Sequence, residues 1–130
     1  MDQSNAAAAK IFVASGATSM TDVTGFGFLG HLWEMVKGSR FGVRLNVSAI
    51  PVFDGVIELI AGGTTSSLQE SNESVLQEFV IDSRVDPTKL KALVDPQTSG
   101  GLLASVPENL APDCLRKLQV AGYAASIVGD

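Results

Sequence analysis

Apolar and polar residues alternate with two different periods along this 130-residue chain. A helical period predicts helices in six segments: residues 5–15, 25–37, 53–60, 74–81, 87–94 and 108–120. Asp86 as N-cap and Pro87 at the first helical position favour the start of the fifth segment. Gly16 follows the first segment where a left-handed C-terminal cap is expected.

Strands are predicted over residues 18–23, which are rich in β-branched residues, over residues 42–47, which alternate with a period of two, and over residues 102–106 and 125–128. The alternation is clearest over residues 42–47, where Val43, Leu45 and Val47 share one face. Residues 64–72 are polar and rich in turn formers, so they predict a long surface loop. About four strands separated by helices, without an internal repeat, predict one layered domain over residues 1–130.

Composition narrows the class of protein. Hydrophobic residues make up 45% and charged residues 18%, as in folded globular domains, and no apolar run reaches the ~20 residues of a bilayer span. The start shows no signal peptide, so we expect a cytoplasmic protein without a membrane segment. Cys114, the single cysteine, falls on the inner face of a predicted helix, and we assign it no redox role.

The net charge of −5 arises from acids scattered along the chain, and the nine basic residues form no patch. This distribution argues against a nucleic-acid partner. It also repels a polyanion such as ATP unless a cation screens the charge.

The first segment with candidate chemistry is residues 21–27, where Asp22 ends a predicted strand just before a glycine-containing helix start. A carboxylate there offers an oxygen ligand to Mg²⁺, and the free N–H groups of the helix face an anion. Taken alone, the spacing favours a simpler interpretation, in which Asp22 or Thr24 caps the helix.

The second segment is the glycine-rich turn at residues 95–101, where the hydroxyls of Thr98 and Ser99 and the backbone N–H groups are positioned to face a phosphate. It lacks the lysine of a P-loop, and a plain helix-to-strand turn explains its glycines equally well. His31 has no second His or Cys at zinc-ligand spacing, so a surface or partly buried histidine is expected. With one histidine, the chain contains no complete catalytic constellation.

Together the two segments read TSMTDVTGFGFLGHL (residues 18–32) and LVDPQTSGGLL (residues 93–103). They resemble the two signatures of the carboxy-terminal half of the selenophosphate synthetase family. The wider superfamily includes aminoimidazole ribonucleotide synthetase, a hydrogenase maturation factor and thiamine-monophosphate kinase. The Gly-His-Leu that closes the first signature and the Pro-Gln-Thr-Ser-Gly-Gly of the second are more similar to the selenium enzyme.

The resemblance implies an enzyme that transfers phosphate from ATP to selenide, giving selenophosphate, AMP and orthophosphate. Mg²⁺ and ATP would bind between two halves, and Asp22 matches a Mg²⁺ ligand of the family. Thr24, Thr98, Ser99 and Gly100 are further candidates for nucleotide contacts. The reactive cysteine or selenocysteine and two further metal-binding aspartates would lie in the amino-terminal half, so no catalytic residue is assigned here.

The resemblance further implies an α+β fold, a layered α/β/α domain with a mostly antiparallel sheet of about four strands, partly ferredoxin-like. The partners would be the amino-terminal half and, in the intact enzyme, a second copy in a homodimer. We expect the isolated domain to bind neither ATP nor Mg²⁺ appreciably. Two alternatives stay open, namely another superfamily enzyme and a stand-alone, non-catalytic interaction module. A fragment and a natural short form both fit the sequence.

Overall fold

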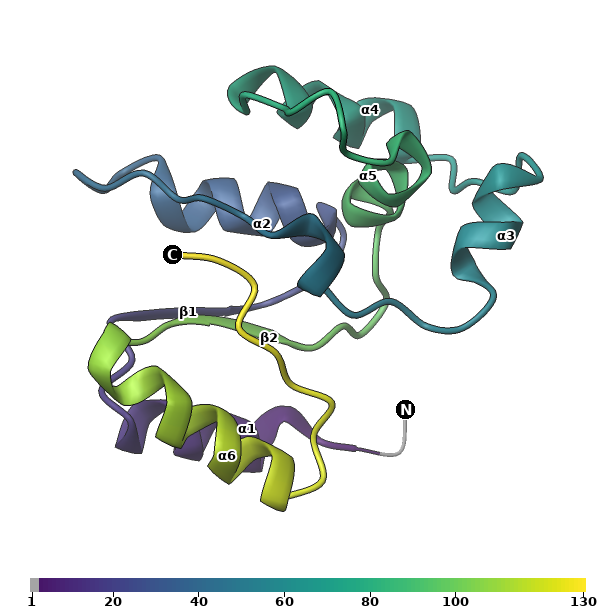
Figure 1. The fold of residues 1–130 in the computed structure, drawn as a ribbon. Coiled ribbons are helices and arrows are strands. Elements are labelled where there is room, and N and C mark those ends of the chain that lie inside the picture. The colour runs from purple at the N-terminus through teal and green to yellow at the C-terminus, as the bar shows by residue number, and fades with distance from the viewer. Residues whose placement is uncertain (1–2) are drawn as a thin grey trace.

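The computed structural model describes residues 3–130, which contain six α-helices and two β-strands (Figure 1). The helices are α1 (Asn5–Ala14), α2 (Gly27–Val36), α3 (Val56–Ala61), α4 (Gln69–Glu73), α5 (Pro87–Val94) and α6 (Ala111–Val120). The strands are β1 (Ser19–Asp22) and β2 (Leu102–Ser105). Three short 3-10 helices connect them: η1 (Val47–Ala49), η2 (Ser74–Glu78) and η3 (Glu108–Leu110).

The two strands form an antiparallel sheet between two layers of helices. Ser19 lies opposite Ser105, and Asp22 lies opposite Leu102. In Figure 1, α1 and α6 lie together on one side of the sheet, and α2, α4 and α5 lie on the other. The predicted α+β class is therefore confirmed, with the sheet as the middle layer.

Strand β2 separates two hydrophobic cores because successive strand residues point to opposite faces. Leu103 belongs to the larger core, and its neighbour Leu102 packs against the smaller one. The other buried residues of the larger core are Val23, Leu29, Leu32, Ile50, Leu93 and Val94. Those of the smaller core are Ala8, Cys114 and Leu118. Helical spacing in α2, α5 and α6 thus supplies most of the buried surface.

The predicted helix ends are confirmed where a side chain or a glycine determines them. The Asp86 carboxylate accepts a hydrogen bond from the Thr88 N–H at 2.9 Å and caps α5. At the end of α1, Gly16 has a φ of 75°, which glycine adopts without steric cost. These ends are fixed locally, which is why the sequence alone reveals them.

Two of the four predicted strands are not confirmed as regular strands. Residues 42–47 and 125–128 meet only through a short antiparallel pairing of residues 44–46 with residues 128–130. Arg44 N donates to Asp130 O at 2.7 Å, Asp130 N donates to Arg44 O at 3.0 Å, and Asn46 N donates to Val128 O at 2.8 Å. The pairing ends at Asn46 because η1 begins at the next residue and turns the chain out of the extended conformation.

One loop prediction and two helix predictions need smaller corrections. The predicted loop at residues 64–72 contains the start of α4, because Gln69 is buried and its Nε2 donates to the Lys91 carbonyl of α5 at 3.2 Å. The predicted helix at residues 74–81 is only the 3-10 turn η2. The helix predicted from residue 108 starts as η3 and becomes α-helical at Ala111. In each case a tertiary contact or a turn overrides the local pattern.

Candidate functional site

The fold brings the two signature segments into direct contact. Val23 N donates to Gly101 O at 2.9 Å, and Gly100 N donates back to Val23 O at 3.0 Å. One residue further along the first segment, Thr24 O accepts a hydrogen bond from Gln97 N at 3.0 Å. Segments more than 70 residues apart in the sequence are therefore joined through their backbones.

Two glycines permit this close approach. A Cβ on Gly27, whose φ is 69°, would lie 2.7 Å from the carbonyl carbon of Val94. A Cβ on Gly100 would lie 2.4 Å from the Val23 carbonyl oxygen. Both obstacles are backbone atoms, which cannot rotate away as a side chain can. The glycines of the signatures are thus required by packing, whatever ligand the site holds.

Two asparagine side chains hold the segments in place, and neither was predicted: Asn72 joins the two segments to each other, and Asn5 joins α1 to the second segment. Nδ2 of Asn72 donates to the carbonyls of Gly25 and Val94, both at 2.9 Å. Nδ2 of Asn5, at the start of α1, donates to Gly100 O at 3.1 Å. No spacing rule predicts such contacts, because they join elements that meet only in the folded chain.

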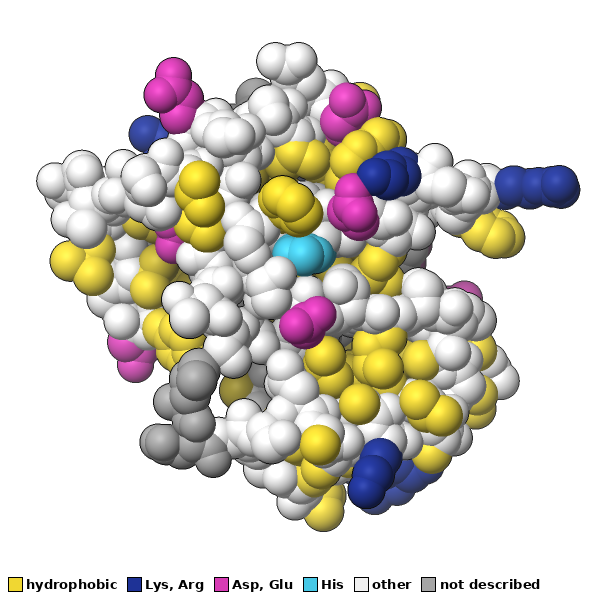
Figure 2. All heavy atoms as spheres, turned by 180° about the vertical axis from the view of Figure 1, so that it is seen from behind, with side chains coloured by type: hydrophobic (Ala, Val, Ile, Leu, Met, Phe, Trp, Pro, Cys, Tyr) yellow, Lys and Arg dark blue, Asp and Glu magenta, His cyan; other side chains and the backbone are white. Residues whose placement is uncertain are grey.

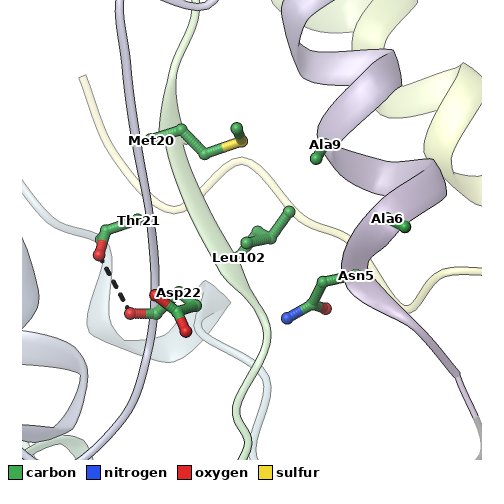
Figure 3. A pocket seen from close by; sticks show the side chains of 7 residues that line it. All are labelled: Asn5, Ala6, Ala9, Met20, Thr21, Asp22 and Leu102. Carbon is green, nitrogen blue, oxygen red and sulfur yellow. Dashed lines mark hydrogen bonds between the residues drawn. The ribbon is translucent and has the colours of Figure 1, made fainter.

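Asp22 is exposed at the end of β1 and lines a shallow cavity of about 400 Å³ (Figure 3). The cavity lies between β1, β2 and the first turns of α1, and Figure 3 shows the side chains around it. Its lining residues are Asn5, Ala6, Ala9, Met20, Thr21, Asp22 and Leu102. Asp22 is the only acid among these lining residues, all of which belong to the described range 3–130.

Asp22 offers the type of ligand that Mg²⁺ prefers, but the number of such ligands around it is too small. A carboxylate oxygen is a suitable Mg²⁺ ligand. Within residues 3–130, however, no group of three His, Cys, Asp or Glu side chains is placed to hold a metal ion. A cation at Asp22 would therefore have to complete its coordination with neutral oxygen ligands, with water, or with groups of another domain.

The other predicted contact residues lie around the junction of the two segments. Thr98 and Ser99 are exposed, Gly100 is half-buried, and Thr24 is half-buried in the turn between β1 and α2. The Thr24 hydroxyl lies 3.0 Å from Nε2 of His31, a contact that the sequence analysis missed. His31 is partly buried, as expected, and is the cyan side chain in Figure 2.

One further acid belongs to the second signature. Asp95 follows α5 directly, and burial raises the pKa of its carboxyl above the usual range. An anion at the C-terminus of a helix is also disfavoured by the helix dipole. Figure 2 shows the remaining acidic and basic side chains of that face scattered, with no single-sign patch.

Two remaining features concern Cys114 and the helices. Cys114 is buried in the smaller core, in agreement with its predicted place on the inner face of a helix. Among residues 3–130, no helix combines the length and the apolar character needed to cross a bilayer.

A family model described as AIR synthase related protein, C-terminal domain, matches residues 2–130. The chain belongs to this family. Three relatives within it illustrate the similarity, and each is named selenide, water dikinase. The protein from Geobacter sp. (strain M21) is 39% identical over 126 residues, which cover 97% of this chain and 36% of the relative.

The two other relatives are equally extensive matches. Selenide, water dikinase 2 of Peptoclostridium acidaminophilum is 41% identical over 126 residues, covering 96% of this chain and 36% of the relative. The protein of Clostridioides difficile (strain 630) is 34% identical over 127 residues, with the same two shares. The predicted resemblance to selenophosphate synthetases is thereby confirmed. This AIR synthase-related domain spans only 36% of the length of these relatives.

Proposed function

We propose that this chain is the carboxy-terminal domain of a selenide, water dikinase and completes an ATP and Mg²⁺ site together with an amino-terminal domain. The observation that carries the proposal is the identity of 34–41% to the three relatives over almost the whole chain. The reaction is the transfer of phosphate from ATP to selenide, with AMP and orthophosphate as the other products. The contact between the two signature segments supports a shared site at their junction.

Asp22 is the residue of this chain that we assign to the metal. Its carboxylate is exposed at the end of β1, so a second domain has access to it. Mg²⁺ neutralises phosphate charge when bound, which a chain of net charge −5 needs in order to accept ATP. Thr24, Thr98, Ser99 and Gly100 lie near the same junction and are the proposed contacts for the phosphates.

The remaining machinery belongs to the other domain. The reactive cysteine or selenocysteine and further metal-binding aspartates would come from the amino-terminal part, and the intact enzyme would be a homodimer. Because one carboxylate holds Mg²⁺ weakly, we expect the isolated chain to bind neither Mg²⁺ nor ATP appreciably. Calorimetry that shows micromolar Mg-ATP binding to this chain alone would refute that expectation.

The four-stranded sheet is also part of the proposal. The three backbone hydrogen bonds between residues 44–46 and 128–130 support two further strands that lengthen when the other domain is present. Amide hydrogen exchange at Arg44 and Asn46 measures this directly. Slower exchange on addition of the amino-terminal domain is expected, and unchanged exchange would limit the sheet to β1 and β2.

The decisive experiment is a mixing assay. The amino-terminal part of the Geobacter sp. (strain M21) relative is expressed separately, mixed with this chain, and assayed for selenide-dependent AMP formation. We expect activity with the native chain and a loss of roughly 100-fold or more with Asp22→Asn, since loss of outer-shell groups alone costs metal sites about 10–100-fold. Asp54→Asn, which removes an exposed carboxylate from the turn before α3, is the matched control.

The outcomes separate the alternatives. Activity that survives in Asp22→Asn would remove Asp22 from the metal site. Association of the two parts without any AMP formation would favour a different substrate or a non-catalytic interaction module.

A further inference from the structure

The single histidine of the chain contacts the turn between β1 and α2. Nε2 of His31 lies 3.0 Å from Oγ1 of Thr24, although seven residues separate them. Within residues 3–130 this is the only hydrogen bond of the Thr24 hydroxyl. The hydroxyl therefore has one partner of fixed position and unused capacity for a ligand.

The imidazole of His31 is also held from a second direction. Its ring centroid lies 5.5 Å from that of Phe26, with a tilt of 45° between the planes. Phe26 reaches this position because residue 30 is glycine, since a Cβ there would lie 2.7 Å from Cβ of Phe26. The ring of His31 is thus held between a hydroxyl and an aromatic ring, which restricts its orientation.

The direction of the Thr24–His31 hydrogen bond decides what Thr24 offers to a ligand. A hydroxyl has one proton and two lone pairs. If His31 donates its Nε2–H, the Thr24 proton is free to donate elsewhere. If His31 accepts, the proton is used and Thr24 presents only lone pairs.

The surroundings of Thr24 favour the first arrangement for a phosphate ligand. The carbonyl of Thr24 accepts a hydrogen bond from the backbone N–H of Gln97 in the second signature, so the hydroxyl lies at the junction of the two segments. A phosphate oxygen only accepts hydrogen bonds at neutral pH, and Asp22, two residues away, adds a negative charge that disfavours the anion. A Thr24 hydroxyl that donates its proton to the phosphate offsets the repulsion from Asp22. A hydroxyl that presents only lone pairs to the phosphate would add to that repulsion.

We propose that His31 is a positioning residue, which donates Nε2–H to Thr24 and thereby turns the Thr24 hydroxyl proton toward a phosphate oxygen of the nucleotide. The phosphate part of this inference rests on the proposed function. The hydrogen bond itself does not, because it is a property of the chain alone.

The hydrogen bond is tested on the chain by ¹⁵N NMR of the imidazole, which is unambiguous because the chain has one histidine. We expect a proton on Nε2 and a shift of the Nε2 resonance in Thr24→Val. Thr24→Ser, which keeps the hydroxyl, and Thr18→Val, which removes an exposed hydroxyl from the turn before β1, should leave it in place. The proposal is overturned if Nε2 of His31 carries no proton, or if its ¹⁵N resonance does not shift in Thr24→Val.

The phosphate contact is tested in the mixed enzyme. We expect Thr24→Val and His31→Phe each to raise the KM for ATP by roughly 10-fold or more, with kcat within about 2-fold, because one hydrogen bond to a charged group is lost in ground and transition state alike. The double variant should be no worse than either single one. His31→Gln, which places an amide donor near the same point, should restore most of the affinity.

The results distinguish this inference from the function on which it rests. Additive effects, or a loss in kcat alone, would show that His31 acts independently of Thr24 and would overturn the positioning role. If the mixture of native parts forms no AMP, the proposed function and the phosphate contact fail together. The NMR result then still decides whether His31 donates to Thr24.

Discussion

Replacing Gly27 with alanine tests the close contact between the two signature segments. Gly27 has a φ of 69°, and the new Cβ would lie 2.7 Å from the carbonyl carbon of Val94 and 2.8 Å from its Cα. A left-handed backbone costs an L-residue about 1–2 kcal/mol. Forcing a methyl group against packed atoms adds about 1–3 kcal/mol. We therefore expect Gly27→Ala to lower the free energy of unfolding by about 2–5 kcal/mol.

Urea unfolding measures this loss, with the fluorescence of Trp33 as the signal. Trp33 is the single tryptophan and packs edge-on to Phe79, with ring centroids 6.4 Å apart, so unfolding changes its surroundings. Small domains have urea m-values of about 1–3 kcal/mol/M, and the midpoint should fall by roughly 1 M or more. Since a domain of this size has only about 5–15 kcal/mol of stability, the variant is expected to be marginal.

Gly25→Ala provides the matched control two residues away. Gly25 has no positive φ, and no atom lies within 4 Å of a Cβ at this position. Its replacement should change the free energy of unfolding by less than about 1 kcal/mol. Equal midpoints for the two variants would refute the inference that Gly27 is required by its contact with Val94.

Three further predictions use the same unfolding assay. Gly100→Ala places a Cβ 2.4 Å from the carbonyl oxygen to which residue 100 donates, so its midpoint should fall, whereas Gly101→Ala meets open space and should leave it unchanged. Asn72→Ala removes two hydrogen bonds and should lower the free energy of unfolding by about 1–3 kcal/mol, against little change for Asn109→Ala on the surface. Asp95→Asn should stabilise the chain at about pH 7, because burial raises the pKa of Asp95 in the folded state and its charged form therefore opposes folding. That contribution appears as the pH rises through the normal pKa of aspartate, so the difference between variant and native chain should vanish near pH 3, and a constant difference would exclude this cause.

Local signals in the sequence were enough to predict β1, β2 and α5, whereas the contact between the two signature segments was not predicted. Asp86 and Pro87 mark the start of α5 without reference to any other element. The pairing of β1 with β2 was accessible only through the resemblance, because nothing in residues 18–23 specifies residues 102–106 as a partner. The metal role of Asp22 follows from the same source, whereas Thr24 was a candidate from its place in the segment alone.

The features that the sequence did not reveal depend on tertiary contacts. Residues 42–47 alternate well, yet only Leu45 and Val47 pack against the larger core and Val43 stays 37% exposed. Only part of the predicted face is therefore buried, and the regular strand is absent, since a strand also needs a neighbour along its length. Asn72 lay in a segment that looked like a loop, and its role depends on carbonyls 22 and 47 residues away.

Two helix ends in the signature segments conflict with local preferences. Helix α5 begins with a well-formed cap at Asp86 but ends at a partly buried acid, Asp95, where the helix dipole and burial both disfavour a negative charge. Helix α2 begins without a side-chain cap, at a glycine of positive φ. Such conflicts between local preference and fold are expected where a residue is retained for its role in a functional site and not for its contribution to stability. Helices α3, α4 and α6 also begin without a side-chain cap, so the uncapped start of α2 does not by itself mark a site. The raised pKa of Asp95 is the conflict that an experiment can resolve. If Asp95→Asn stabilises the domain while the mixed enzyme loses activity, the acid is kept for function at the expense of stability. If Asp95→Asn stabilises the domain without loss of activity, the unfavourable position of Asp95 at the end of α5 has no role in the reaction.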